Sequence, residues 1–297
     1  MPSLSPKGAS PLERQAEALP SALSRSPSGV SKGEVIEVRS TDGTRLGVER
    51  LGEGPALLAV HGGTADRSRW APVVGPLSER FTLYLLDRRG RGASQSESEG
   101  PYALEREAED VACVVEAIGE PVLCLGHSYG ALVCMEALLL TNRIAKALLY
   151  EPPFDTPGHT VTQGESGDFF DRFSALLRNG EREAALELFY TEVIGIDPAP
   201  IRVLPVWQAR LAAVHTLERE GRIGLQYRCE PERYASLQVP IRFLLGECSP
   251  PAFKASSAAA VAAIPGSKLV VLPEQGHTMI DADPRGFVTQ VLQFFES

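Results

Sequence analysis

The stretch from Val122 to Leu140 constrains the fold of this chain more than any other. Its first four residues are all apolar, which is typical of a short strand covered on both faces. The sequence Gly-His-Ser-Tyr-Gly follows, and the remainder is apolar nearly all round, which predicts a buried helix. A chain that turns directly from a strand into a helix needs small residues at the turn, and Gly126 and Gly130 flank Ser128. The pattern therefore predicts that the Ser128 hydroxyl projects from the end of a strand, beside the backbone N–H of Tyr129.

Strand-like and helix-like segments alternate on both sides of this stretch. An antiparallel hairpin is predicted over residues 34–39 and 45–50, because the Asp42-Gly43 pair between them is a strong turn signal. Apolar strands are predicted over 55–60, 81–86, 122–125, 145–150, 240–246 and 268–273, and helices over 71–80, 104–118, 129–140, 252–264 and 284–295. This alternation indicates an α/β protein with a mostly parallel, doubly wound sheet.

The alternation breaks in the middle of the chain. Three helices are predicted there without a strand of comparable quality, over 169–178, 182–192 and 205–220. The last of them is expected to end at Gly221. A helical insertion in such a sheet is expected to cap the carboxyl ends of the strands, where these folds bind ligands. We therefore predict a helical cap of residues 152–233 inserted into a core of residues 33–151 and 234–297.

Charge, cysteine content and the N-terminal segment limit the partners and the location that we expect. A formal net charge of −9 argues against nucleic acid and anionic membranes, because no basic face can displace counterions. No apolar run reaches the roughly 18–20 residues of a membrane span. The five cysteines are scattered without C-x-x-C spacing, which predicts buried free thiols in a reducing compartment. Residues 1–32 are rich in Ser, Pro, Ala and Gly and lack a signal-peptide pattern, so we expect a flexible tail on a cytoplasmic monomer or homodimer.

A histidine near the end of the chain is a candidate base for the serine. A serine hydroxyl is a poor nucleophile until a base removes its proton, and histidine, with an ordinary pKa of roughly 6.5, is the usual base. His277 follows the last predicted strand in a Gly-His turn, so it should reach the same edge of the sheet as Ser128. His61 is expected to pack behind the Gly62-Gly63 turn, and alternation along the strand predicts that His127 points away from Ser128.

These features together resemble the α/β-hydrolase superfamily. The resemblance covers about residues 34–151 and 234–297. The motifs that carry it are Gly126-His-Ser-Tyr-Gly130, His61-Gly62-Gly63 with Trp70 beyond it, Asp87-x-Arg-Gly-x-Gly-x-Ser94 and Gly276-His277. The resemblance implies a nucleophile at Ser128, a base at His277, and an oxyanion hole formed by the backbone N–H groups of Gly63 and Tyr129. Each such donor is typically worth about 10²–10³ in rate.

The acid that supports the histidine is where the sequence departs from this family. Many relatives carry Gly-x-x-Asp-Pro after the strand that follows the cap, whereas Gly246-Glu-Cys-Ser-Pro250 has Ser249 at the position of the aspartate. Some members take the acid instead from the end of the strand after the nucleophile helix, and Glu151 matches that position. We favour Glu151 as the acid; Glu247, another acid or none remain alternatives. Glu274 is expected to face solvent.

The predicted cap and the first half of the core each carry residues that could contact a substrate. Aromatic residues are frequent in the cap and could roof an apolar pocket or merely pack the cap helices together: Phe169, Phe170, Phe173, Phe189, Tyr190 and Trp207. The arginines of the turn after the second apolar strand, Arg88, Arg89 and Arg91, are expected to fix that turn. Binding of a substrate carboxylate is the alternative for them.

The leading hypothesis is a serine hydrolase that needs neither cofactor nor metal. It would cleave a carboxylic ester, lactone or thioester of an apolar small molecule through an acyl-enzyme on Ser128. A C–C bond hydrolase, an acyltransferase or a cyclase of secondary metabolism would use the same parts. A non-catalytic ligand-binding protein of this fold is a further alternative, which the missing aspartate after Gly246 favours.

Overall fold

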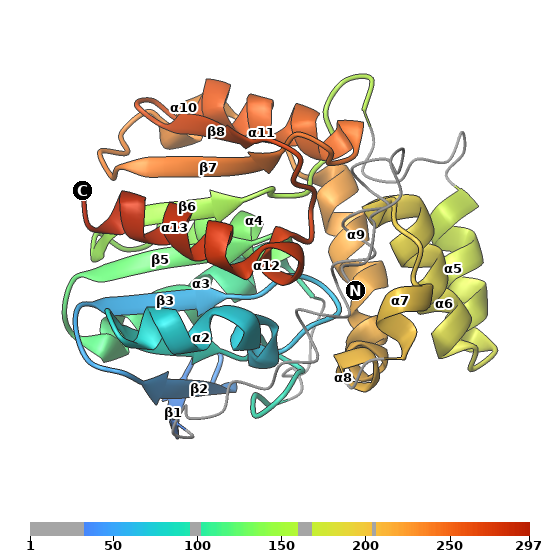
Figure 1. Ribbon diagram of the computed structural model, residues 1–297, viewed down its shortest axis with the longest axis horizontal. Coiled ribbons are helices and arrows are strands. Elements are labelled where there is room, and N and C mark those ends of the chain that lie inside the picture. Colours follow the sequence, from blue (N-terminus) through green and yellow to red (C-terminus); the bar gives the residue numbers. More distant parts are fainter. Residues whose placement is uncertain (1–32, 96–101, 160–167, 204–205) are drawn as a thin grey trace, which may run out of the picture.

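The computed structural model describes residues 33–95, 102–159, 168–203 and 206–297. The tail predicted for residues 1–32 lies outside these ranges. At the centre of the described chain is an eight-stranded sheet with the strand order β1-β2-β4-β3-β5-β6-β7-β8 (Figure 1). The strands are β1 (Glu34–Arg39), β2 (Arg45–Leu51), β3 (Ala56–Val60), β4 (Thr82–Leu86), β5 (Val122–His127), β6 (Ile144–Tyr150), β7 (Ile241–Gly246) and β8 (Lys268–Leu272). The predicted succession of strands along the chain is confirmed.

The hairpin strands and the other strands of the sheet differ in their direction. β1 and β2 are antiparallel to each other, and β2 is antiparallel to β4, whereas all other neighbours in the sheet are parallel. β3, β4 and β5 are buried along their whole length, as their apolar sequences predict. The sheet is therefore mostly parallel, and its central strands lead to one edge.

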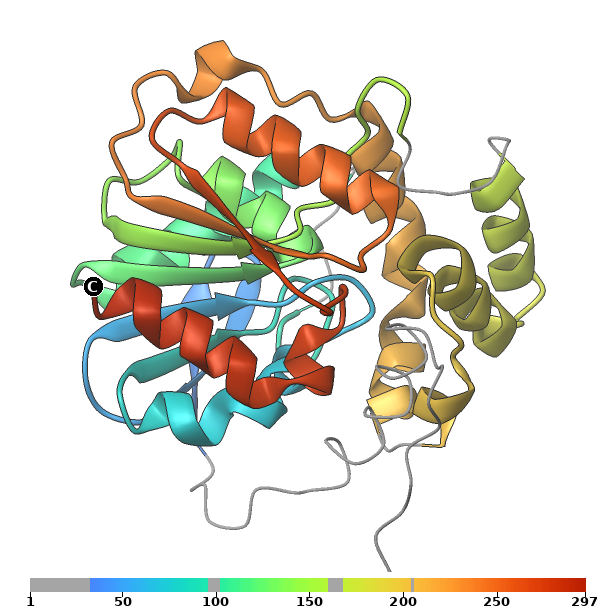
Figure 2. The same ribbon diagram turned by 45° about the horizontal axis from the view of Figure 1, so that its top comes forward.

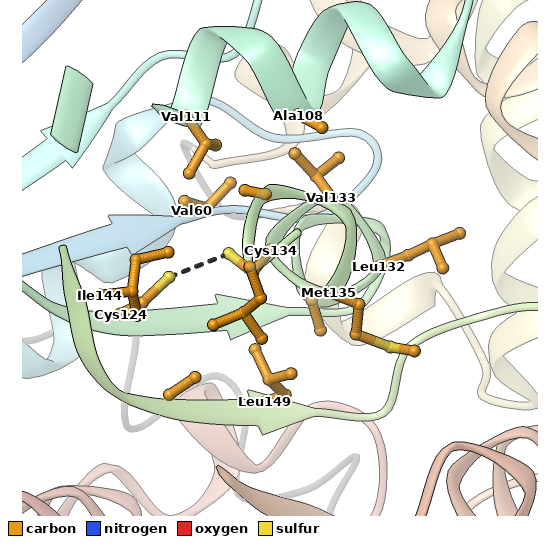
Figure 3. Close-up of a cluster of buried hydrophobic side chains, with 14 of the residues drawn as sticks. Val60, Ala108, Val111, Cys124, Leu132, Val133, Cys134, Met135, Ile144 and Leu149 are labelled. Atoms are coloured by element: carbon orange, nitrogen blue, oxygen red, sulfur yellow. Dashed lines mark hydrogen bonds between the residues drawn. The ribbon is translucent and has the colours of Figure 1, made fainter. Parts of the chain in front are cut away.

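Helices cover both faces of the sheet. α2 (Ala71–Ser78), α12 (Met279–Ala282) and α13 (Pro284–Phe295) pack on one face, and α3 (Leu104–Ile118), α4 (Tyr129–Ala137), α10 (Pro231–Tyr234) and α11 (Pro251–Ala263) on the other. Figure 3 shows part of the core on this second face, where α4 packs against the sheet and against α3. The sulfur atoms of the free cysteines Cys124 and Cys134 are in contact there, 3.2 Å apart. Every residue of α4 is buried, as predicted for the helix after Ser128. The helix is shorter than predicted, because it ends at Ala137 and the predicted end, Leu140, is exposed.

The helices between β6 and β7 form a separate layer beyond the carboxyl ends of the parallel strands (Figures 1 and 2). They are α5 (Asp168–Arg178), α6 (Arg182–Phe189), the π-helical turn η2 (Tyr190–Ile194), α7 (Ala199–Arg202), α8 (Val206–Ala213), the 3₁₀ turn η3 (Val214–Thr216) and α9 (Leu217–Gln226). Their apolar side chains form a cluster of their own, to which Phe253 of α11 also belongs. No helix of the described residues is long and apolar enough to cross a membrane.

One predicted helix is wrong in both its continuity and its end. The sequence predicted a single helix over 205–220 that ends at Gly221, but the structure has α8, the 3₁₀ turn η3 and α9 there. α9 runs through Gly221 and Gly224 and ends at Gln226. The reason is packing: a Cβ atom on Gly221 would lie 2.4 Å from Cζ of Phe170. This glycine therefore admits an aromatic ring of α5 against α9 instead of ending the helix.

Candidate active site

Ser128 stands at the sharp turn between β5 and α4. Its backbone has a positive φ of 54° with ψ of −128°, which is unusual for a residue with a side chain. The neighbouring glycines make this turn possible, because a Cβ atom on Gly130 would lie 2.3 Å from the carbonyl oxygen of Val60, and one on Gly126 would lie 2.7 Å from Cα of Ala131. Ser128 is half-buried, whereas both of its neighbours in the chain are buried. The side chain therefore borders a cavity at the edge of the sheet.

Backbone strain in the described chain gathers at the carboxyl ends of strands. The non-glycine residues with positive φ are Thr64, Ser128, Glu151 and Glu274, and they come after β3, β5, β6 and β8 respectively. Such conformations cost of order 1–3 kcal/mol each and persist where the surrounding structure enforces them, which is common at functional sites. These strained conformations therefore favour a functional site at the carboxyl ends of the strands.

Glu151 and His277 form a buried pair at this edge. Oε2 of Glu151 lies 2.5 Å from Nδ1 of His277, and the two residues are 0% and 5% exposed. The other carboxylate oxygen, Oε1, accepts hydrogen bonds from the backbone N–H of Gly246 at 2.7 Å and from the hydroxyl of Ser249 at 2.5 Å. Three donors thus hold a carboxylate that has no contact with water, and they orient the imidazole with Nδ1 toward it.

The other residues weighed for the acid have different partners. Ser249, at the position where many relatives have aspartate, donates its hydroxyl to Glu151. Glu247 is exposed and accepts a hydrogen bond from the backbone N–H of Glu274, which is exposed as expected. Sequence reasoning missed the link between Ser249 and Glu151 because 98 residues separate them.

Two rings enclose the imidazole of His277. Phe253 stacks on it with centroids 4.2 Å apart and planes inclined by 23°, and the His127 ring lies 4.8 Å away. Nε2 of His127 is 3.1 Å from the carbonyl oxygen of His277. Burial is the largest cause that holds the pKa of His127 well below its ordinary value, and the positive charge of Arg69 acts in the same direction, so His127 is neutral and donates to that carbonyl. His127 thus belongs to the surroundings of the site, which alternation along the strand did not predict.

His61 packs behind the Gly62-Gly63 turn, as predicted, and its ring also contacts the turn. It is fully buried, its Nδ1 lies 2.9 Å from the carbonyl oxygen of Gly62, and its Nε2 accepts the backbone N–H of Arg88 at 3.1 Å. Burial and the charge of Arg88 hold the pKa of His61 well below its ordinary value. A neutral imidazole that accepts at Nε2 carries its proton on Nδ1, so that proton points to the turn.

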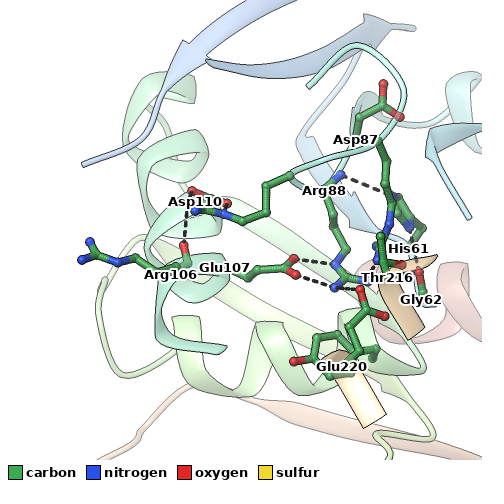
Figure 4. A network of polar contacts seen from close by, with 12 residues as sticks. His61, Gly62, Asp87, Arg88, Arg106, Glu107, Asp110, Thr216 and Glu220 are labelled. Carbon is green, nitrogen blue, oxygen red and sulfur yellow. Dashed lines mark hydrogen bonds and ion pairs between the residues drawn. The ribbon is translucent and has the colours of Figure 1, made fainter. Parts of the chain in front are cut away.

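The arginines after β4 are bound to carboxylates (Figure 4). Arg88 donates to both oxygens of Glu107 at 2.6 Å, to Glu220 at 2.9 Å and to the carbonyl oxygen of Gly62 at 3.1 Å. Arg91 donates to Glu220 and Thr216, and Arg89 donates to Asp110 on α3. Their predicted role in fixing the turn is confirmed. They also connect the turn to α9, through Glu220.

Two cavities meet at Gly63 and Ser128. The first, which we call the apolar cavity, is lined mainly by aromatic and aliphatic side chains: Phe169, Phe170, Phe189, Val193, Leu217 and Phe253. Tyr129 and Glu220 also line it. The second, which we call the arginine cavity, is lined mainly by polar and charged side chains: His127, His277, Thr278, Arg69, Arg210 and Asp281. Tyr190 also lines it.

The aromatic residues predicted to roof a pocket therefore divide into two groups. Phe169 and Phe170 line the apolar cavity, Tyr190 lines the arginine cavity and Phe189 lines both, whereas Phe173 and Trp207 are buried among the helices. Sequence reasoning missed Arg69, Arg210 and Asp281 entirely, because no motif or spacing marks them. Within the described residues, no group of three or more His, Cys, Asp or Glu side chains is arranged to hold a metal ion.

Comparison with known proteins agrees with this arrangement. The profile of the family described as the alpha/beta hydrolase family matches residues 57–290. A pimeloyl-[acyl-carrier protein] methyl ester esterase of Aeromonas hydrophila subsp. hydrophila is 25% identical over 254 residues, which are 84% of this chain and 98% of the relative. The crystal structure of an alpha/beta hydrolase from Sphaerobacter thermophilus has a TM-score of 0.73 and 31% identity, covering 86% of this chain and 99% of that one. That of an esterase from Rhodococcus sp. has a TM-score of 0.72 and 26% identity, covering 89% and 98%.

Proposed function

This chain belongs to the α/β hydrolase family, and we propose that it cleaves a carboxylic ester, lactone or thioester through an acyl-enzyme on Ser128. The observation that carries the proposal is the pair of Glu151 and His277, whose imidazole borders the same cavity as Ser128. The similarity to two proteins described as esterases supports it.

In the proposed reaction, Ser128 attacks the carbonyl carbon while Nε2 of His277 takes the proton of the hydroxyl. The carboxylate of Glu151 keeps the other ring proton on Nδ1 and stabilises the imidazolium that forms. His277 then returns the proton to the leaving oxygen or sulfur as its bond to the carbonyl carbon breaks. Water, activated by the same imidazole, hydrolyses the acyl-enzyme and restores the free hydroxyl.

The negative oxygen of the tetrahedral intermediate needs donors, and we propose the backbone N–H groups of Gly63 and Tyr129 for this role. Both residues line the apolar cavity together with Ser128. Tyr129 is the first residue of α4, where the helix dipole favours a negative charge. His61 and Arg88 each bind the carbonyl oxygen of Gly62, which keeps the turn rigid beside this position.

We further propose that residues 152–233 act as the cap of the site. Phe169 and Phe170 of α5 and Leu217 of α9 line the apolar cavity, and Arg210 of α8 lines the arginine cavity. The non-catalytic alternative depended on the missing aspartate after Gly246. Glu151 offers a buried carboxylate to His277 in its place, so that reason no longer favours a binding protein.

Labelling with a fluorophosphonate probe tests the proposal directly. We expect the probe to label Ser128 in the native chain and to fail with Ser128→Ala, and 4-nitrophenyl butyrate to be hydrolysed by the former alone. Glu151→Gln should lower kcat by about 10²–10⁴ because the histidine loses its supporting charge. Glu247→Gln is the matched control, an exposed glutamate that should leave kcat unchanged. A native chain without labelling at neutral pH would contradict the proposal.

A further inference from the structure

The arginine cavity contains a cluster of two arginines and one aspartate. Arg69 lies in the 3₁₀ turn η1 (Arg67–Trp70), Arg210 in α8 and Asp281 in α12. Asp281 accepts a hydrogen bond from Nη1 of Arg69 at 2.7 Å through Oδ1, whereas its Oδ2 is 3.7 Å from Nη2 of Arg210. The second distance is that of an ion pair without a hydrogen bond. All three residues are less than one-tenth exposed.

This cluster leaves one positive charge uncompensated. Among the described residues that line the arginine cavity, Asp281 is the only acid, and His127 is neutral because burial holds its pKa well below the ordinary value. The pKa of Arg210 is lowered to about 10, mainly by burial and to a smaller extent by the charge of Arg69, and Asp281 opposes this only in part. A guanidinium buried without a hydrogen-bond acceptor is costly to the fold. An anion in the cavity would supply the missing acceptor.

The side chain of Arg210 is nevertheless held in place. Its Cζ lies 5.4 Å from the centre of the Tyr190 ring, within the range of a cation–π contact. Tyr190 belongs to the π-helical turn η2 and lines the same cavity. The guanidinium is thus fixed beside the cavity while its donors stay unused by the described residues, and a planar guanidinium matches a carboxylate with two parallel hydrogen bonds.

The position of His277 assigns each cavity to one half of a substrate. The imidazole must give a proton to the leaving oxygen, so the leaving group has to lie on the side that His277 borders. His277 lines the arginine cavity and is absent from the lining of the apolar one. The acyl group then occupies the apolar cavity, next to the N–H groups of Gly63 and Tyr129.

We propose that Arg210 binds a carboxylate carried by the leaving group, so that the natural substrates are esters of a hydroxy acid with an apolar acyl chain. This inference rests on the proposed esterase function and adds its specificity. The arginines that the sequence singled out are unsuited to the task. Arg88 and Arg91 are bound to Glu220, a carboxylate that lines the apolar cavity and would repel another anion.

A matched pair of chromogenic esters tests the proposal. One is 4-nitrophenyl butyrate, and the other carries an added carboxylate on its nitrophenyl ring; water converts each into butyrate and the free phenol. The quantity measured is the ratio of kcat/KM for the carboxylated ester to that for the neutral one. Arg210→Gln should lower this ratio by about tenfold to a hundredfold, mainly through KM, because a charge-assisted pair of hydrogen bonds is lost. Arg210→Lys keeps the positive charge but loses the two parallel donors of the guanidinium, so its ratio should lie between those of the native chain and Arg210→Gln.

Controls separate this inference from the function on which it rests. Arg202→Gln, at an arginine of α7 whose side chain is 52% exposed, should leave the ratio unchanged. Fluorophosphonate labelling of Ser128 in Arg210→Gln shows that the variant is folded with an intact site. A ratio in Arg210→Gln within twofold of the native value overturns the inference and leaves the esterase function standing, whereas a native chain that is neither labelled nor active on either ester overturns both. A 4-nitrophenyl ester with the carboxylate on its acyl chain should not depend on Arg210, and a dependence there overturns the assignment of the two halves.

Discussion

Two buried arginine clusters border the candidate site, and they differ in charge balance. In the first, Arg88 and Arg91 meet the carboxylates of Glu107 and Glu220, so that two cations face two anions. In the second, Arg69 and Arg210 share the single carboxylate of Asp281. Both clusters connect the sheet core to the helices between β6 and β7. The arginines of the first cluster are therefore neutralised by carboxylates, whereas those of the second carry one more positive charge than Asp281 can neutralise.

The two clusters differ in the number of hydrogen-bond acceptors that each guanidinium contacts. Arg88 is 1% exposed and makes four hydrogen bonds to Glu107, Glu220 and the Gly62 carbonyl. Arg210 is 7% exposed and, within the described residues, has only the 3.7 Å ion pair with Asp281 and the contact with Tyr190. Nearly equal burial thus accompanies very different compensation. The balanced cluster should contribute to stability, and the unbalanced one should reduce it.

The largest expected effect is that of Arg88→Met. The variant removes the guanidinium that binds both oxygens of Glu107, and it leaves Glu220 with Arg91 as its remaining cation. Removal of one member of a buried ion pair typically costs about 3–5 kcal/mol. Urea unfolding followed by tryptophan fluorescence measures the loss as a lower midpoint at an unchanged slope.

The matched control for Arg88→Met is Arg143→Met. Arg143 also pairs with a glutamate of α3, Glu116, but the two side chains are 44% and 53% exposed, so this change should cost less than about 1 kcal/mol. If Arg88→Met lowered the free energy of unfolding no more than Arg143→Met does, the cluster of Arg88 and Arg91 would not stabilise the fold. The contrast between the two arginine clusters would then be wrong.

Asp281→Asn should have an intermediate effect and should respond to anions. It leaves Arg69 and Arg210 without a carboxylate, but they border a cavity that water and small anions can enter, so we expect a loss of about 1–3 kcal/mol. Acetate should raise the Tm of this variant more than that of the native chain at equal ionic strength, because it can replace the missing carboxylate. Asp171→Asn, at an exposed aspartate of α5, is the control and should show no such response. Equal shifts in Tm for Asp281→Asn and the native chain would mean that the cluster has no room for an anion.

Local sequence patterns indicated Ser128, His277, Glu151 and the arginines after β4, but they did not indicate Arg69, Arg210 or Asp281. Ser128, His277 and Glu151 each follow an apolar strand, and the carboxyl ends of parallel strands meet at one edge of the sheet, so local patterns suffice to predict that they lie together. The arginines after β4 are likewise marked by the turn in which they lie.

The residues that the sequence did not reveal are paired over long separations between irregular segments. Arg69 and Asp281 are 212 residues apart, and each lies in a helical turn of four residues, without a periodic pattern. Arg210 lies in a short helix whose packing against Tyr190 and Asp281 is decided by the arrangement of the whole helical layer. Gly221 failed as a stop signal for the same reason, since contact with Phe170 overrides its low helix propensity.

The smallest effect on stability, and the sharpest test of the comparison, is expected for Arg210→Met. Asp281 keeps its hydrogen bond to Arg69, methionine can still pack against Tyr190, and a charge without a hydrogen-bond acceptor is removed. The free energy of unfolding should therefore change by less than about 1 kcal/mol, and a gain is within expectation. The same substitution at Arg88, measured in the same urea experiment, should differ from it by at least about 2 kcal/mol. A loss of that size at Arg210 would make it a structural arginine like Arg88, whereas unchanged stability together with lost preference for the carboxylated ester means that the fold carries this buried charge for its substrate.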